Sequence, residues 1–106
     1  MKRKSPVHRP QALPEILSAL RGLQDEARHR YRAEIVGVFG SYARGEARRP
    51  SDLDVLVRFL EGASLFDLVG LADFLEENLG LKVDVVSERA IRPELRERIL
   101  NEAVRV

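Results

Sequence analysis

An alternating run over residues 52–59 limits the folds open to this chain more than any other feature of its sequence. Every second residue from Leu53 to Phe59 is apolar and falls on one side of an extended strand, whereas Asp52 and Asp54 open the other side. Two like charges on one side of a strand repel each other, and a bound cation relieves that repulsion. The run therefore predicts a strand with one face in the core and a pair of carboxylates at its start.

The spacing of apolar residues divides the rest of the chain into further helices and strands. The expected elements are a helix from Ala12 to about His29, a strand over 34–39, a short helix within 41–47, a helix over 65–79 ended by Gly80, a strand over 81–86, a helix opened by Pro93 and an edge strand over 103–106. This order predicts an α/β (α+β) fold.

The helix over 65–79 carries a long apolar stripe, and we expect that stripe to be buried in the core of the chain itself. A dimer or partner surface is the alternative use. The residues of the stripe are Leu65, Leu68, Val69, Ala72, Leu75 and Leu79.

Length and composition indicate one soluble domain. The 106 residues suffice for one modest core, so residues 11–106 are expected to form a single domain and residues 1–10 a disordered tail without a periodic pattern. Cysteine is absent, no apolar run reaches the roughly 18 residues of a membrane span, and residues 1–10 do not resemble a secretory signal. We therefore expect a cytoplasmic protein. The net charge of +1 gives no direct sign of nucleic-acid binding.

Asp84 is the candidate for a third carboxylate beside Asp52 and Asp54. It lies on the polar side of the strand over 81–86, as the two aspartates do in their own strand. If the two strands are neighbours, about 4.8 Å apart, Asp84 reaches the space in front of the pair. Three carboxylates favour a hard divalent cation, and Mg²⁺ completes its octahedron with water and phosphate oxygens. The pattern predicts a phosphoryl-transfer site.

The pair Gly40-Ser41 supplies phosphate donors for such a site. It follows the strand over 34–39 at the start of a short helix, where backbone N–H groups are free, and Arg44 adds a fixed positive charge one turn later. Two metal ions roughly 3.5–4 Å apart would activate an incoming hydroxyl and steady the departing pyrophosphate. Asp52 and Asp54 would bridge both ions, and Asp84 would hold the ion beside the hydroxyl and could accept its proton.

Plainer interpretations of these residues remain open. Asp52 and Asp54 could be two solvated carboxylates, and Asp84 a lone aspartate on an exposed strand face. The Gly40-Ser41 pair alone is compatible with an ordinary turn, and Arg44 with a surface arginine paired with Glu46. Two further basic residues of this loop are weaker candidates, Arg48 and Arg49.

Taken together, these motifs resemble the nucleotidyltransferase superfamily that includes DNA polymerase β, and specifically its minimal nucleotidyltransferases. The resemblance covers nearly the whole chain after the first helix. The motifs are Gly40-Ser41-Tyr42-Ala43-Arg44-Gly45, then Ser51-Asp52-Leu53-Asp54, then Val83-Asp84-Val85, with a compact ending RPELRERILNEAVRV that also looks like that group. The resemblance implies a polymerase β-like fold, with a small, mostly antiparallel sheet and helices against one face. It also implies two Mg²⁺ ions and a nucleoside triphosphate, usually ATP, whose nucleotide is moved onto a hydroxyl.

The resemblance also implies a partner. Larger relatives carry a second domain for the acceptor, which we do not expect here, and minimal members are often encoded beside a HEPN-domain protein. Such pairs resemble toxin–antitoxin modules in which the antitoxin adds AMP to a tyrosine of its partner. The alternative is a non-catalytic interaction module that neutralises its partner by stoichiometric binding. The acceptor, the preferred base and any homo-oligomer do not follow from the sequence.

Overall fold

The computed structural model describes residues 12–47 and 51–106. The tail predicted over residues 1–10 and the two weaker arginine candidates, Arg48 and Arg49, lie outside these residues. In the described part of the chain, each expected helix and strand is present, with its ends displaced by at most two residues. A short 3₁₀ turn, η1, which the sequence analysis did not predict, spans Glu88–Ala90.

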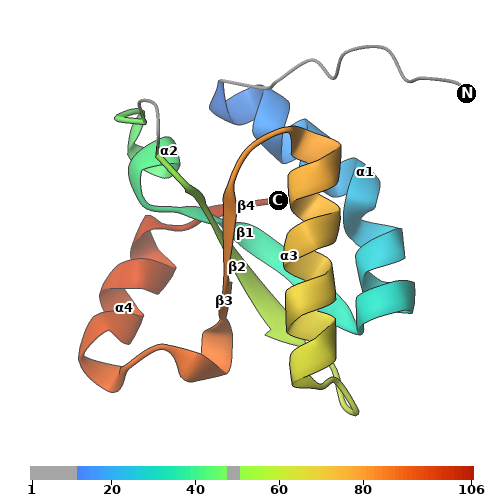
Figure 1. Ribbon diagram of the computed structural model, residues 1–106. Coiled ribbons are helices and arrows are strands. Elements are labelled where there is room, and N and C mark those ends of the chain that lie inside the picture. The colour runs from blue at the N-terminus through green and yellow to red at the C-terminus, as the bar shows by residue number, and fades with distance from the viewer. Residues whose placement is uncertain (1–11, 48–50) are drawn as a thin grey trace, which may run out of the picture.

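The elements alternate along the chain (Figure 1). In order they are α1 (Leu13–Tyr31), β1 (Ala33–Phe39), α2 (Ser41–Arg44), β2 (Leu53–Phe59), α3 (Leu65–Leu79), β3 (Val83–Ser87), η1, α4 (Pro93–Glu102) and β4 (Val104–Arg105). A proline lies in the first turn of α1 (Pro14) and of α4 (Pro93), where its missing N–H costs no helical hydrogen bond. Gly80 in the left-handed conformation ends α3, as predicted.

The four strands form one mixed sheet in the order β3-β2-β1-β4. β1 pairs antiparallel with β2 and with β4, whereas β2 pairs parallel with β3. The sheet is therefore mostly antiparallel, as predicted. The one parallel pair needs a long crossover, and α3 supplies it.

The main core lies between the sheet and the two longer helices, α1 and α3, which lie side by side (Figure 1). Its largest fully buried side chains include Leu20, Leu53, Leu71 and Leu75. Leu56 points to the other side of β2 and is also fully buried, where β2 contacts η1. No described helix is long and apolar enough to cross a bilayer.

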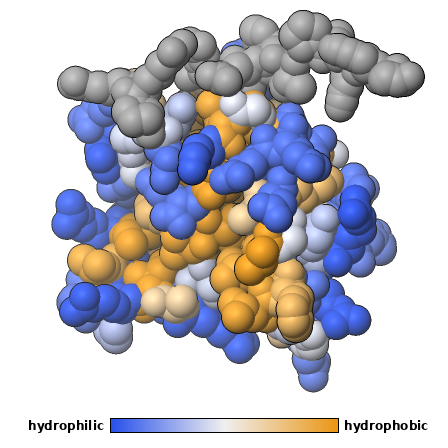
Figure 2. Space-filling model, in the orientation of Figure 1, coloured by the Kyte–Doolittle hydropathy of each residue, from blue (hydrophilic) through white to orange (hydrophobic). Residues whose placement is uncertain are grey.

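The apolar stripe of α3 is only partly buried, so the prediction was wrong for Leu65 and Val69. The helix buries Leu71, Phe74, Leu75 and Leu79, but Leu65, Phe66 and Val69 are 72%, 88% and 56% exposed. Figure 2 shows apolar side chains gathered over this lower half of α3. The contact with α1 fixes which side turns inward, because a Cβ at Gly70 would lie 2.7 Å from the Tyr31 ring.

The C-terminal strand β4 is held at the edge of the sheet by a close backbone contact. Gly37 pairs with Arg105, and Val38 with Val104. A Cβ at Gly37 would overlap the carbonyl oxygen of Val104, so glycine is what lets the two backbones approach. This contact fixes the position of the end of α4, immediately before β4.

We predict that Leu75→Ala lowers the free energy of unfolding by about 2–4 kcal/mol, because it leaves a cavity between α3 and the sheet. The matched control is Leu65→Ala, the same change at an exposed position of the same helix. It should alter the unfolding free energy by less than about 0.5 kcal/mol. Urea unfolding of both variants measures the difference, and equal losses would contradict this account of the core.

Candidate active site

Asp54 and Asp84 lie directly opposite each other in the parallel pair of β2 and β3. Residues paired in register on adjacent strands point to the same side of a sheet. Asp52 precedes β2 by one residue and falls on the same side as Asp54 by the two-residue period of the strand. Asp54 is half-buried, whereas Asp52 and Asp84 are exposed. The parallel register thus brings one acid from each strand to a common edge of the site.

Gly40 lies immediately beside Asp54. Phe39, the last residue of β1, is the register partner of Asp54, and the chain turns at Gly40 with φ of +77° and ψ of −153°. Side-chain-bearing residues rarely adopt this conformation. A Cβ at Gly40 would also overlap Oδ2 of Asp54 and lie 3.1 Å from its Cγ. The predicted glycine turn and the predicted carboxylate therefore form one contact.

The turn leads into α2, a single helical turn that begins at Ser41. Tyr42 and Ala43 pack against the core, which anchors the turn to the rest of the domain. Arg44 lies on its exposed side. Its Nε donates to Glu46 at 3.0 Å, and its Nη1 donates to Glu102 at 3.0 Å. The pairing of Arg44 with Glu46, considered as the plainer interpretation, is present.

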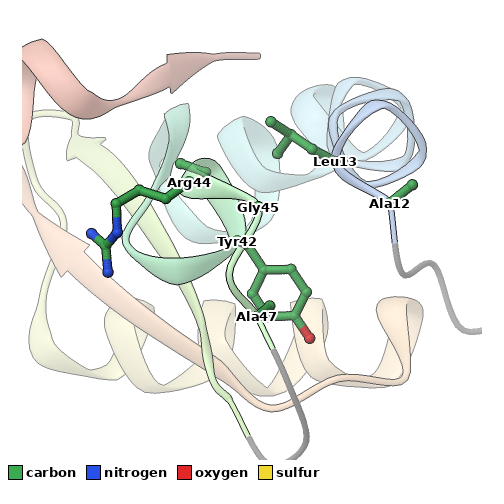
Figure 3. A pocket seen from close by; sticks show the side chains of 7 residues that line it. Ala12, Leu13, Tyr42, Arg44, Gly45 and Ala47 are labelled. Carbon is green, nitrogen blue, oxygen red and sulfur yellow. The ribbon is translucent and has the colours of Figure 1, made fainter.

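The hydrogen bond to Glu46 and the attraction of Glu102 raise the pKa of Arg44, so that its side chain stays charged. Figure 3 shows the guanidinium pointing away from a hollow of about 340 Å³ on the other side of α2. The hollow is lined by Ala12, Leu13, Tyr42, Ala43, Arg44, Gly45 and Ala47. The charged group of Arg44 therefore lies on the side of α2 that faces Glu102, and not in this hollow.

Glu102 is the site residue that sequence reasoning missed. Its Oε2 accepts a hydrogen bond from the backbone N–H of Gly40 at 2.6 Å, in addition to the one from Arg44. A signal existed in the sequence, because Glu102 directly precedes the predicted edge strand. Continuing the observed register of β4 on β1 places Glu102 opposite Gly40. That pairing had to be known before the glutamate could be assigned to the site.

The acids of this site influence one another's protonation. The pKa of Asp54 is raised from its ordinary 3.8 to about 6, first by burial and then by the charges of Asp84, Asp52 and Glu102, in that order of importance. Arg44 acts in the opposite direction. A cation placed among these groups would therefore favour the charged form of Asp54.

The donors present fit Mg²⁺ as an open site. Among residues 12–47 and 51–106, no group of three or more His, Cys, Asp or Glu side chains is placed so that it could hold a metal ion. Mg²⁺ does not require one, because it binds through one or two carboxylates and keeps waters and substrate phosphates as its other ligands. After burial, the charges of Asp84, Asp52 and Glu102 raise the pKa of Asp54, and a bound cation would offset their repulsion. The assignment of Asp52, Asp54 and Asp84 as ligands stays a prediction.

We predict that Gly40→Ala lowers the free energy of unfolding by about 2–4 kcal/mol, because the new Cβ meets Asp54 in a backbone conformation that disfavours it. The control is Gly22→Ala, in an exposed part of α1 where nothing lies within 4 Å of the added Cβ. That change should stabilise the protein by about 0.5–1 kcal/mol. Chemical unfolding should show changes of opposite sign in the free energy of unfolding of the two variants. A Gly40→Ala variant as stable as the unaltered chain would contradict the packing of the turn.

The raised pKa of Asp54 gives a second prediction. Because the folded protein binds this proton more tightly than the unfolded chain, the contribution to stability is full below pH 3.8 and is lost as the pH rises through about 6. Without divalent cations at pH 7.5, Asp54→Asn should raise the melting temperature by about 2–5 °C, a figure reduced for solvent screening. The gain should disappear near pH 4.

The control for this titration is Asp73→Asn at an exposed position of α3. Thermal unfolding between pH 4 and pH 8 would compare the two variants with the unaltered chain. If the effect of Asp54→Asn did not depend on pH, the pKa of Asp54 would not be raised in the folded protein, and the prediction would be wrong.

Comparisons with known proteins show the family to which the chain belongs. A family model described as a nucleotidyltransferase domain matches residues 20–106. The chain is 43% identical over 94 residues to the protein adenylyltransferase MntA of Thermococcus cleftensis, covering 89% of this chain and 95% of that protein. It is 58% identical over 69 residues to a candidate protein adenylyltransferase of Methanocaldococcus jannaschii. This match covers 65% of this chain and 74% of that protein.

Solved structures share the fold. A candidate minimal nucleotidyltransferase superposes with a TM-score of 0.70 at 48% identity, covering 85% of this chain and 95% of that one. A toxin–antitoxin crystal structure with AMP-PNP superposes with a TM-score of 0.69 at 23% identity. This match covers 83% of this chain and 69% of that one. The chain therefore belongs to the nucleotidyltransferase family, among its minimal members, and is an enzyme of that class, which confirms the resemblance found in its sequence.

Proposed function

We propose that this nucleotidyltransferase moves AMP from ATP onto a hydroxyl of a partner protein, with Mg²⁺, in the cytoplasm. The observation that carries the proposal is the register of β2 and β3, which sets Asp54 opposite Asp84 beside the Gly40 turn. A relative with 43% identity is named a protein adenylyltransferase, which supports both the nucleotide and a protein acceptor.

In this proposal the three aspartates hold the cation and the reacting groups. Asp52 and Asp54 would hold the Mg²⁺ ions, and Asp84 would add a ligand on the side of the acceptor. Bound Mg²⁺ supplies charge for the triphosphate and lowers the pKa of the attacking hydroxyl. Asp84 is exposed, so an acceptor hydroxyl can approach it, and its carboxylate can accept the hydroxyl proton.

The Gly40 turn and Arg44 bind and orient the triphosphate. The Gly40 N–H is a strong backbone donor, and the guanidinium of Arg44 is a fixed charge that donates in a planar fork. Ser41 is the next residue of the turn and can add its hydroxyl as a donor. These groups would hold the phosphates while the bond between the α-phosphorus and the bridging oxygen breaks and pyrophosphate leaves.

The acceptor is proposed to be a HEPN-domain protein in a toxin–antitoxin pair, with this chain as the antitoxin. The shared fold with a toxin–antitoxin structure motivates the pairing. The exposed apolar residues Leu65, Phe66 and Val69 of α3 offer a surface for a protein contact.

The test incubates the chain with Mg²⁺, ATP labelled at the α-phosphorus and the product of the neighbouring gene. Label should appear on that product, and Asp52→Ala with Asp54→Ala should reduce transfer by more than about 100-fold. The reason is that even mutation of residues that hydrogen-bond to metal ligands lowers metal affinity or activity by about 10–100-fold. The measurement is the labelled protein separated by gel and located by mass spectrometry.

The matched control removes two carboxylates elsewhere, Asp73→Ala with Glu77→Ala on α3, and should keep transfer within about twofold of the unaltered chain. Unlabelled partner under all conditions, together with neutralisation by the Asp52/Asp54 variant, would refute the proposal. It would favour a non-catalytic module that neutralises its partner by stoichiometric binding.

A further inference from the structure

Glu102 at the end of α4 makes an unusual contact for a glutamate in an acidic site. Its Oε2 accepts from the Gly40 N–H at 2.6 Å and from Nη1 of Arg44 at 3.0 Å. It is a carboxylate set among the same acids that already repel Asp54. One anionic oxygen is thus bound by a backbone donor and a guanidinium, which is how proteins bind phosphate oxygens.

The position of Glu102 is imposed by the fold. β4 follows α4 after a single residue, Ala103, and pairs with β1 through the close contact at Gly37. The Glu102 side chain is about one-fifth exposed, less than half the exposure of Arg44. The docking of the C-terminal strand therefore brings the Glu102 carboxylate to Gly40, although the two residues are 62 positions apart in the chain.

Each of the two partners of Glu102 also has a contact that does not involve Glu102. Arg44 is also held by Glu46 through Nε at 3.0 Å. Gly40 is fixed by the pairing of Phe39 with Asp54 and by its contact with the Asp54 carboxylate. A structural role for Glu102 as the support of these donors is consequently weak, and what it changes most is their availability to another anion.

A phosphate oxygen competes with Glu102 for the hydrogen bond from the Gly40 N–H, because a backbone amide has a single proton and a shared bond is weaker for each acceptor. The negative charge of Glu102 also opposes the approach of a triphosphate. We propose that Glu102 is a residue of the nucleotide site that competes with the triphosphate for Gly40 and Arg44 and thereby sets its affinity. This inference rests on the phosphate-binding role proposed above for those two residues.

The test measures binding of inorganic tripolyphosphate with Mg²⁺ to the full chain by nuclear magnetic resonance, following the Gly40 amide. Glu102→Gln keeps the size of the side chain and an accepting oxygen but removes its charge. It should bind tripolyphosphate about tenfold more tightly than the unaltered chain. Glu102→Ala, which removes the acceptor, should also bind more tightly. Glu97→Gln, at an exposed position of the same helix, should bind as the unaltered chain does.

A second readout uses the unaltered chain and so does not depend on the folding of a variant. The carboxyl carbon signal of Glu102 should move as tripolyphosphate saturates the site, since the carboxylate loses two hydrogen bonds. Equal or weaker binding by Glu102→Gln, including no binding by either protein, would overturn the proposal, as would an unmoved Glu102 signal.

Tripolyphosphate has no nucleoside and does not react with an acceptor. A failure of AMP transfer would therefore leave this measurement intact. In the same way, an unaltered affinity in Glu102→Gln would refute the role of Glu102 without touching the proposed transfer.

Discussion

The parallel pairing of β2 with β3 is the constraint on which the rest of the site depends. It places Asp54 opposite Asp84, two acids separated by thirty positions in the chain. A shift of one residue would turn Asp84 to the other side of the sheet. The register is held by the apolar side chains of the opposite face, since Leu53, Val55 and Val83 are buried against α1 and α3. One register of β2 and β3 therefore determines both the packing of the core and the arrangement of the acids.

The other edge of the site is built by two close approaches at glycines, one in β1 at Gly37 and one directly after it at Gly40. At Gly40 the chain turns against the Asp54 carboxylate, and at Gly37 the strand admits β4. The second approach carries Glu102 to the N–H of Gly40, where it meets Arg44 as well. The site consequently holds a fourth carboxylate, paired with Arg44, beside its three motif aspartates, and the pKa of Asp54 is raised by burial and by these acidic neighbours. A site with this charge balance suits a substrate that arrives with metal ions.

Much of this structure was predictable from local pattern. The alternation over 52–59 indicated a strand with Asp52 and Asp54 on its polar side, and the Gly40-Ser41 motif indicated the turn. What failed depended on contacts between distant segments. The side of α3 that turns inward is decided by the contact of Gly70 with Tyr31, so Leu65 and Val69 were wrongly expected in the core. Glu102 had no local signature, because its role comes from the pairing of β4 with β1.

The central claim is that the aspartates of β2 and β3 and the Gly40 turn form one site for a divalent cation and phosphate. The most direct measurement is a titration with substoichiometric Mn²⁺, a paramagnetic substitute for Mg²⁺, followed in the amide spectrum of the full chain. The account predicts that the signals of Gly40, Asp54 and Asp84 broaden first and together. Broadening that begins elsewhere, for example at the acidic residues of α3, or that leaves Asp84 unaffected while Asp54 disappears, would contradict it.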